Sequence, residues 1–454
     1  MDIYAPIVKH IVYPLWVLKD NSSELRYLKE YEKTQFYTRE QIRELQWQRL
    51  TRTLEHAYRT SPFYLKRFQE AGIEPSDIKS PEDMLKIPPL SKSDIQNYLD
   101  NLKSNAFTDN DLIRDKTGGS TGSPLVFFYD KDRLASRTAA AIRHDSWTIW
   151  HIGKKMALLW GAVNDLSGFN SIKGQIRNLL LNRKIVLDTS SISEEKLWDF
   201  VYELKKHNPK FFLAYANSMA LFAKFVRDNN ITGIHPIAII TSAEVLTPEN
   251  RELIETVFGC KIYNRYGCRE FSVIASECSY HTGMHINAEN LYLESVRDGK
   301  HVKPGEIGEV IVTDLLNYGM PFIRYKIGDM GSPIDKVCPC GRGLPLMDMV
   351  SGRVTDFIIT PDKKLISGVA IATYVITNIS GIKQIQFIQD TKEQVKIKLV
   401  KNNEFSEESL NKLNSNIIRF LGDKIKIEIE YVDNISLEKS GKYRFSISKV
   451  NTSI

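Results

Sequence analysis

The sequence has no run of the roughly 20 consecutive apolar residues that a membrane-spanning helix needs. Its N-terminal stretch, residues 3–18, is apolar and aromatic, but Pro6, Lys9, His10 and Pro14 interrupt it. It has neither a basic leader nor a small-residue cleavage site, so we do not expect a signal peptide. We expect this stretch to cap its own domain in a cytoplasmic protein, with peripheral contact to a membrane surface as the alternative.

The chain also lacks a strong net charge. Its formal charge of +6 over 454 residues is too weak to indicate nucleic acid, but it suits an anionic substrate such as a nucleotide. A hydrophobic fraction of 42% and a charged fraction of 26% are those of an ordinary globular protein. The length predicts two or more domains.

Cysteine is scarce, with five residues in the chain, and the cysteines are clustered. In a cytosolic enzyme such clustering indicates a metal more than disulfides. Cys278 and His281 form one short pair, and Cys338 and Cys340 form another, so together they predict a tetrahedral, structural zinc site. The alternatives are buried free cysteines beside an unrelated histidine, and His285, which could replace His281 or line a substrate pocket.

Strand-like and helix-like segments alternate through the middle of the chain. The segments 155–160, 211–214 and 237–240 are apolar and strand-like, and the helical patterns 194–206 and 217–229 separate them. This alternation predicts an α/β fold with helices on the faces of a sheet.

The sequence after Gly305 has a more β-like character. We expect a large N-terminal domain, residues 1–352, with mixed sheets, and a small α+β domain, residues 353–454. The small domain contains a helix pattern at 406–421 and strand patterns at 356–360, 384–387, 395–400 and 424–431.

A loop rich in glycine, serine and threonine, residues 115–124, precedes the apolar run 125–129. Glycine lets successive backbone N–H groups converge on one point, which makes a concave anion site. The loop is not a Walker motif, because no Lys-Ser/Thr follows its last glycine. An ordinary surface turn is the alternative. The residues expected to hold nucleotide phosphates are Thr117, Gly118, Gly119, Ser120, Thr121 and Gly122.

Four further clusters carry groups that suit a nucleotide. Residues 241–244 follow a strand pattern, and the carboxyl ends of strands are where α/β folds bind ligands. Residues 263–270 offer aromatic rings for a base and a carboxylate for Mg²⁺. Residues 324–329, together with 352–356, offer an aspartate and an arginine for ribose or phosphate, and residues 440–444 carry a lysine near the C-terminus. Each cluster taken alone is more typical of a solvated loop.

In this order the clusters resemble the motifs of the adenylate-forming superfamily, which includes acyl-CoA synthetases, peptide-synthetase adenylation domains and luciferases. The chain is most similar to its phenylacetate–CoA ligase family, in its short length, in the two cysteine pairs and in residues 317–325. The N-terminal helical region resembles members found with capsule and other surface-polysaccharide genes.

The resemblance implies an ATP-dependent ligase that forms an acyl-AMP from a small carboxylic acid, with Mg²⁺, and then passes the acyl group to an acceptor. It implies catalytic roles for Lys442, Glu270 and Arg353, with Glu270 also holding Mg²⁺. Asp356 would be the hinge of a mobile C-terminal domain. Nucleotide contacts beyond the loop would come from Ser242, Ala243, Glu244, Tyr266, Gly267, Asp329 and Arg353. The acyl pocket would include Tyr215, Ala216, Asn217 and His285.

The chain departs from the family pattern at several motif positions. Ser123 and Pro124 stand where a lysine often follows the phosphate loop, and Arg269 replaces the usual threonine. Four functions remain open. These are acyl transfer to CoA, acyl transfer to an amine or hydroxyl of a polysaccharide sugar, direct transfer of AMP to a hydroxyl, and a non-catalytic binding scaffold.

Overall fold

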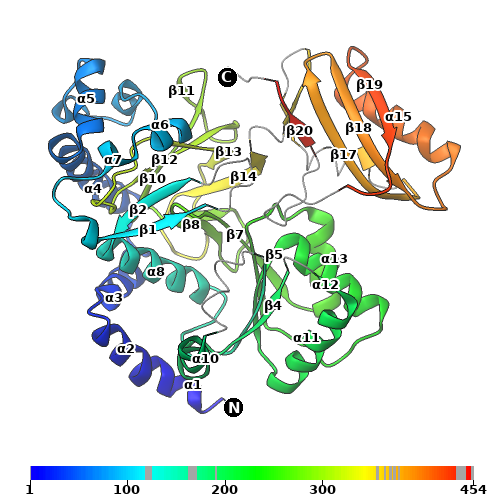
Figure 1. Ribbon diagram of the computed structural model, residues 1–454, viewed down its shortest axis with the longest axis horizontal. Coiled ribbons are helices and arrows are strands. Elements are labelled where there is room, and N and C mark those ends of the chain that lie inside the picture. Colours follow the sequence, from blue (N-terminus) through cyan, green and yellow to red (C-terminus); the bar gives the residue numbers. More distant parts are fainter. Residues whose placement is uncertain are drawn as a thin grey trace.

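The computed structural model describes residues 2–117, 125–161, 171–189, 192–353, 357–361, 365–367, 371, 375–376, 379–435 and 446–450. Figure 1 shows a large N-terminal part and a smaller C-terminal part that contains β17 (Ile382–Thr391) and its neighbouring strands. Among the helices within these residues, none has the length and hydropathy to cross a bilayer.

Helices and short helical turns dominate the first hundred residues, and longer helices return between the strands of the middle region. The helical elements are α1 (Tyr4–Ile7), the π-helical turn η1 (Val8–Val12), α2 (Tyr13–Lys19), α3 (Glu24–Thr34), α4 (Arg39–Thr60), α5 (Pro62–Ala71), η2 (Pro75–Asp77), η3 (Glu82–Lys86), α6 (Lys92–Asn97), α7 (Leu99–Leu102), η4 (Asp109–Asp111), α8 (Lys131–Ser146), α10 (Ile172–Arg177), the π-helical turn η6 (Asn178–Asn182), α11 (Glu194–His207), α12 (Ala216–Asp228), α13 (Pro248–Phe258) and α15 (Glu407–Leu421).

Within the described residues, the strands form one large sheet and three small ones. They are β1 (Leu112–Lys116), β2 (Val126–Asp130), β3 (Met156–Trp160), β4 (Lys184–Asp188), β5 (Phe211–Tyr215), β6 (Ala238–Ser242), β7 (Lys261–Cys268), β8 (Ser272–Glu277), β9 (Met284–Ile286), β10 (Leu291–Arg297), β11 (Lys300–His301), β12 (Gly308–Asp314), β13 (Tyr325–Ile334), β14 (Leu346–Arg353), β15 (Phe357–Ile359), β16 (Leu365–Ser367), β17, β18 (Gln394–Lys401), β19 (Lys426–Tyr431) and β20 (Ser446–Ser448).

The large sheet has 12 strands in the order β11-β10-β12-β13-β14-β9-β8-β7-β6-β5-β3-β4. Neighbouring strands from β4 to β7 run parallel, and those from β7 to β11 run antiparallel. Strand β7 therefore joins an α/β half to a meander-like half. This mixed α/β architecture confirms the fold class expected from the sequence.

The parallel half is buried on both faces, which explains its continuous apolar strands. On β3, Ala157 and Leu159 pack in the core beneath helices α11, α12 and α13. The alternate residues Met156 and Leu158 belong to a separate core on the other face. Figure 1 shows these three helices, in green, together on one face of the sheet.

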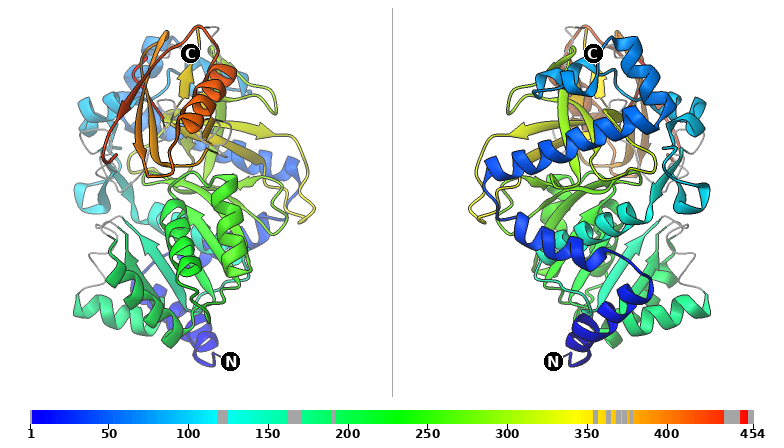
Figure 2. Two further views of the ribbon diagram at one scale, coloured as in Figure 1. Left: turned by 90° about the vertical axis from the view of Figure 1, so that its right-hand side faces the viewer. Right: turned by 90° about the vertical axis from the view of Figure 1, so that its left-hand side faces the viewer.

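The N-terminal helices cover the antiparallel half of the molecule. Figure 2 shows α3 and α4, in two shades of blue, on the side away from the C-terminal part. A capping box between Thr38 and Gln41 fixes the start of α4. Tyr31 and Thr34 on α3 donate hydrogen bonds to Asn290 (3.1 Å) and Glu289 (2.8 Å), so this layer is tied to the turn before β10.

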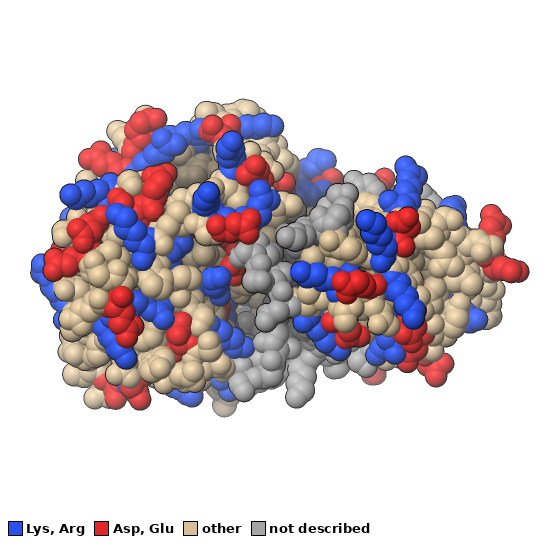
Figure 3. Space-filling view, turned by 90° about the horizontal axis from the view of Figure 1, so that it is seen from above, with Lys and Arg blue, Asp and Glu red and all other residues tan. Residues whose placement is uncertain are grey.

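The C-terminal part has its own core. Strands β19, β18, β17 and β20 form a four-stranded sheet, and Leu413, Ile417 and Leu421 on α15 pack against its apolar side chains. This is the α+β composition expected from the sequence. Seen from above in Figure 3, this part lies beside the larger part, and charges of both signs are intermixed over both surfaces.

Candidate active site

Two parallel strands end side by side where the sequence predicts contacts to the acid. Tyr215 on β5 and Ser242 on β6 are direct partners in the sheet register. Just beyond β6, the Glu244 carboxylate accepts a hydrogen bond of 2.8 Å from the backbone N–H of Asn217. Between them, Ala243 has a left-handed backbone (φ +67°), a strained conformation that often marks functional turns. The structure thus brings together Tyr215, Ala216, Asn217, Ser242, Ala243 and Glu244.

The motifs around Tyr266 and Asp329 meet across the large sheet. The Tyr266 hydroxyl donates to Asp329 Oδ2 at 2.8 Å, and the Tyr325 hydroxyl donates to Glu270 Oε1 at 3.3 Å. Asp329 on β13 is also the register partner of Arg353 on β14. Two carboxylates and the backbone of the predicted arginine are therefore gathered next to the end of β7.

A tight backbone approach explains the glycine of the Tyr-Gly motif. A Cβ atom on Gly267 would lie 2.2 Å from the carbonyl oxygen of Ser272, so another residue there would force the β7–β8 hairpin apart. Gly267 therefore has a structural role in holding the turn that carries Glu270.

Burial controls the protonation of the aromatic partners. It raises the pKa of Tyr266 well above its usual value, and the nearby Asp329 carboxylate raises it further. Burial and the Glu270 carboxylate act on the pKa of Tyr325 in the same direction. Both phenols therefore remain protonated and serve as donors to the two carboxylates. Cys268 between them also stays a neutral thiol, because burial and Glu270 raise its pKa.

Two hydrogen bonds join the residues on either side of the phosphate-loop candidate, Thr117 and Leu125. The backbone N–H of Thr117 donates to the Leu125 carbonyl, and the Leu125 N–H donates to Thr117 Oγ1, both at 2.9 Å. At the base of the loop, Asp115 pairs with Arg269 at 3.3 Å. This ion pair places the start of the loop beside the residue that precedes Glu270.

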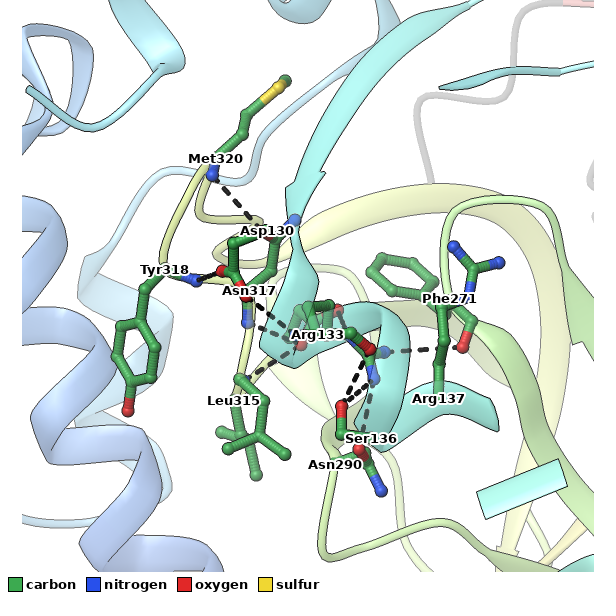
Figure 4. A network of polar contacts seen from close by, with 12 residues as sticks. Asp130, Arg133, Ser136, Arg137, Phe271, Asn290, Leu315, Asn317, Tyr318 and Met320 are labelled. Carbon is green, nitrogen blue, oxygen red and sulfur yellow. Dashed lines mark hydrogen bonds and ion pairs between the residues drawn. The ribbon is translucent and has the colours of Figure 1, made fainter. Parts of the chain in front are cut away.

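A buried polar network joins Asp130 and Arg133 to the segment 314–319 (Figure 4). The Asp130 carboxylate accepts hydrogen bonds from the backbone N–H groups of Arg133 (2.7 Å), Tyr318 (3.1 Å) and Gly319 (3.1 Å). Arg133 Nε lies 2.6 Å from Asp314 Oδ2, and both side chains are 1% exposed. These contacts fix the segment that leads into the Asp329 motif.

The same arginine also reaches the turn after β7. Arg133 donates to Asn290 Oδ1 at 3.1 Å and lies 3.5 Å from the carbonyl oxygen of Phe271, the residue after Glu270. Neighbouring Arg137 donates to the Arg269 carbonyl at 2.8 Å. Sequence reasoning missed this network, because isolated charges after a strand look locally like surface residues.

Four side chains form a compact donor cluster next to strand β9. The ligand atoms of Cys278, His285, Cys338 and Cys340 all lie within 4.8 Å of one another. The sulfurs of Cys278 and Cys338 are 3.5 Å apart, and Cys340 Sγ is 3.4 Å from His285 Nε2. All five cysteines lie within the described residues and are free thiols. Three thiols and an imidazole at these separations suit tetrahedral zinc.

The prediction of His281 as the fourth ligand is wrong. His281 occupies a left-handed turn position (φ +50°), and its Nδ1 lies 3.1 Å from Glu277 Oε2. His285 on β9 lies in the cysteine cluster instead, the alternative ligand expected from the sequence. Burial lowers the pKa of His285 to about 4, and its Nδ1 faces the Leu344 carbonyl at 3.4 Å. A neutral imidazole oriented by a backbone carbonyl is the usual arrangement of a zinc ligand.

Several predicted residues lie outside the described residues. These are residues 118–122 of the phosphate loop, Asp356 and Lys442, and the same applies to the side chain of Arg353.

Known proteins resemble both parts of the chain. Residues 358–449 match the CapK C-terminal domain family. Protein CapK of Staphylococcus aureus is 24% identical over 413 residues, which cover 90% of this chain and 89% of CapK. The phenylacetate-coenzyme A ligase of Thermus thermophilus is 26% identical over 342 residues, 71% of this chain and 72% of that enzyme.

Solved structures share the fold. A 2-hydroxyisobutyryl-CoA ligase in the postadenylation state, in complex with 2-HIB-AMP, aligns with a TM-score of 0.73 at 18% identity over 90% of each chain. An O-succinylbenzoate coenzyme A synthetase from Bacillus subtilis, in complex with ATP and magnesium, aligns with a TM-score of 0.52 at 15% identity, covering 73% of this chain and 68% of that one.

The chain shares the fold of the 2-hydroxyisobutyryl-CoA ligase structure. In sequence, the chain is similar to protein CapK and to phenylacetate-coenzyme A ligases.

Proposed function

We propose that the protein activates a small carboxylic acid with ATP and then transfers the acyl group to an acceptor. The observation that supports this most directly is the pairing of Tyr266 with Asp329 and of Tyr325 with Glu270. This pairing holds two carboxylates next to the carboxyl end of β7, the last strand of the parallel half. The carboxyl ends of parallel strands are the usual ligand-binding edge of such sheets.

In the proposed first step, a carboxylate oxygen of the acid attacks the α-phosphorus of ATP. The bond from that phosphorus to the bridging oxygen breaks, and pyrophosphate leaves. Asp329 and Arg353 are assigned to the ribose, Glu270 to Mg²⁺, and the loop from Thr117 to Gly122 to the phosphates. Bound Mg²⁺ would neutralise phosphate charge. Lys442 would offset the negative charge that develops as the two anions meet.

The acid is assigned to the carboxyl ends of β5 and β6. Tyr215, Ala216 and Asn217 would contact it, and the turn from Ser242 to Glu244 would lie along the adenylate. The ring of Trp160 lies 4.5 Å from the ring of Tyr215, which limits the space at this edge and favours a small acid.

In the proposed domain division, Lys442 lies in the small C-terminal domain, apart from the groups that bind ATP and the acid. Residues 1–352 would bind ATP and the acid, and residues 353–454 would close over them, with Asp356 as the hinge. In this proposal the small domain rotates between adenylation and acyl transfer.

Two classes of acceptor fit the proposal: the thiol of CoA, and an amine or hydroxyl of a surface-polysaccharide sugar. The phenylacetate-coenzyme A ligases support CoA. The match of residues 358–449 to the CapK C-terminal domain supports the sugar acceptor over CoA. In this proposal the small domain takes part in acyl transfer, so a different small domain suits a different acceptor. Incubation of acid and ATP with CoA or with nucleotide-linked amino sugars, followed by mass spectrometry of the acylated product, distinguishes the two.

Trapping with hydroxylamine tests the first step itself. An acyl-adenylate gives a hydroxamate of the acid together with pyrophosphate, whereas direct AMP transfer to a hydroxyl gives pyrophosphate without a hydroxamate. We expect hydroxamate from one class of small acid. Pyrophosphate release without any hydroxamate would contradict the proposal.

We also propose that Cys278, His285, Cys338 and Cys340 hold one structural zinc ion. The bound ion would tie the loop from Cys338 to Cys340 to the end of β8, and all four protein ligands would fill its coordination sphere. We therefore assign it no part in the reaction.

A further inference from the structure

The N-terminal helical run presents apolar side chains on two opposite faces. Ala5, Val8, Tyr13 and Val17 are buried against the rest of the protein, as expected for a cap. On the outer face, large aliphatic side chains recur every three or four residues, about one helical turn apart. These outer side chains are Ile3, Ile7, Ile11, Leu15 and Leu18, with exposed fractions of 43–79%.

A second helical segment, α10 with η6, extends this exposed surface. The Tyr4 hydroxyl donates to the Leu180 carbonyl at 3.1 Å, and the Arg177 guanidinium lies over the Trp16 ring at 5.3 Å. Figure 1 shows α10 next to the N-terminal helices. The segment adds four exposed aliphatic side chains: Ile172, Ile176, Leu179 and Leu180.

We call these nine side chains the aliphatic patch. They account for nine of the 22 large hydrophobic side chains that are exposed among the described residues. A globular protein rarely exposes so many aliphatic side chains together unless something binds there.

The charged residues around the aliphatic patch are mainly basic. Lys9, Lys19, Lys173 and Arg177 are exposed on the same two segments. The sequence from Ile172 to Asn182 contains no acidic residue. Within residues 2–20 the acidic residues are Asp2, which pairs with Arg183 at 2.8 Å, and Asp20 at the end of α2. Glu24 on α3 faces Arg177.

We propose that the aliphatic patch docks this protein on an anionic membrane surface. The two helical segments would lie in the plane of the bilayer, with their aliphatic side chains among the acyl chains and their lysines at the anionic headgroups. The excess of basic residues favours an anionic lipid surface over a second copy of this chain, whose own patch would carry the same charge. The inference is independent of the proposed reaction.

Flotation of the full chain with lipid vesicles tests this proposal. We expect binding to vesicles of phosphatidylcholine mixed with phosphatidylglycerol, and weaker binding to phosphatidylcholine alone or at high salt. Ile11→Glu should weaken binding by about tenfold or more, because it replaces an aliphatic side chain that would be buried in the bilayer with a charged one. Lys173→Gln should weaken it less, and only for the anionic vesicles.

A matched control is available on the C-terminal helix α15. Ile418 and Ile11 are each 54% exposed, so Ile418→Glu introduces the same change away from the patch and should leave vesicle binding unchanged. Ile11→Glu should keep the wild-type unfolding temperature, since its side chain faces solvent. Equal binding by the two variants, or no vesicle binding by the wild type, would overturn the proposal. So would a wild-type dimer that Ile11→Glu dissociates without any vesicle binding, since it would assign the patch to a second copy.

Discussion

At the residue scale, the candidate active site is built from carboxylates whose orientation is fixed before any ligand binds. Asp329 accepts from Tyr266, and Glu270 accepts from Tyr325. Because burial keeps both phenols protonated, each carboxylate has a permanent donor. Groups fixed in this way need little reorganisation when charge develops in the transition state.

Glu270→Gln should slow acyl-adenylate formation by roughly 10²–10³-fold, the typical cost of one electrostatic contact to a transition state. The amide keeps the shape of the side chain but loses the charge assigned to Mg²⁺. Initial rates of adenylation at saturating acid measure the effect. Glu404→Gln, at an exposed position in the C-terminal part, is the matched control and should be unchanged. A normal rate for Glu270→Gln would remove Glu270 from the site.

Lys442→Ala should abolish adenylation and leave the unfolding temperature unchanged. The positive charge of Lys442 is assigned to the developing charge on the α-phosphate, and its loss leaves that charge uncompensated. Lys412→Ala, on an exposed position of α15, is the comparison variant. Full acyl-AMP formation by Lys442→Ala would reassign this lysine to the solvated tail.

At the element scale, the cysteine cluster links the end of β8 to the loop around Cys338. Purified protein should contain about one zinc per chain. His285→Asn should lose the metal and lower the unfolding temperature, because metal binding contributes to folding. His281→Asn should keep the metal, since His281 instead contacts Glu277. Metal analysis and thermal unfolding of both variants provide the measurement. Loss of zinc from His281→Asn alone would restore His281 as the ligand.

The network that joins α8 to the segment before β13 should carry a large share of local stability. Asp314→Asn leaves the Arg133 charge buried without its partner, which typically costs about 3–5 kcal/mol. The exposed pair of Lys449 and Asp390, 2.7 Å apart with side chains 64% and 48% exposed, provides the control. Asp390→Asn should cost less than about 1 kcal/mol. Urea unfolding measures both variants, and equal effects would contradict the proposed role of the network.

The sequence predicts regular elements well where burial imposes a pattern. The expected strands 211–214 and 395–400 correspond to β5 and β18, and the expected helix 406–421 corresponds to α15. Apolar strands buried on both faces and an amphipathic helix leave a clear local signal. The strained turn at Ala243 leaves none, because its conformation depends on neighbours from two strands.

The candidate site was predicted as a set of motifs, but its contacts were not. Tyr325 lay inside a recognised motif, yet its bond to Glu270 depends on how β13 folds next to the end of β7. The zinc-ligand prediction fails for the same reason. Sequence spacing favours His281, which is nearer to Cys278, but strand β9 places His285 beside the cysteines. Contacts between residues distant in sequence follow from topology and leave no local pattern.

At the scale of the whole molecule, strand β7 joins the two halves of the large sheet, and the candidate site lies where they meet. The parallel half contributes the ends of β5 and β6, and the antiparallel half contributes Asp329 and the backbone of Arg353. The C-terminal part is assigned the remaining catalytic group. This arrangement explains why the motifs of one site are spread over most of the chain.

The most direct test of the central claim is ATP–pyrophosphate exchange across a panel of small carboxylic acids, without CoA or any other acceptor. The account predicts exchange with one class of acid, slowed by roughly 10²–10³-fold in Glu270→Gln. Measurable ATP binding without exchange for any acid would contradict it, because a chain that forms acyl-adenylates must also run that step in reverse.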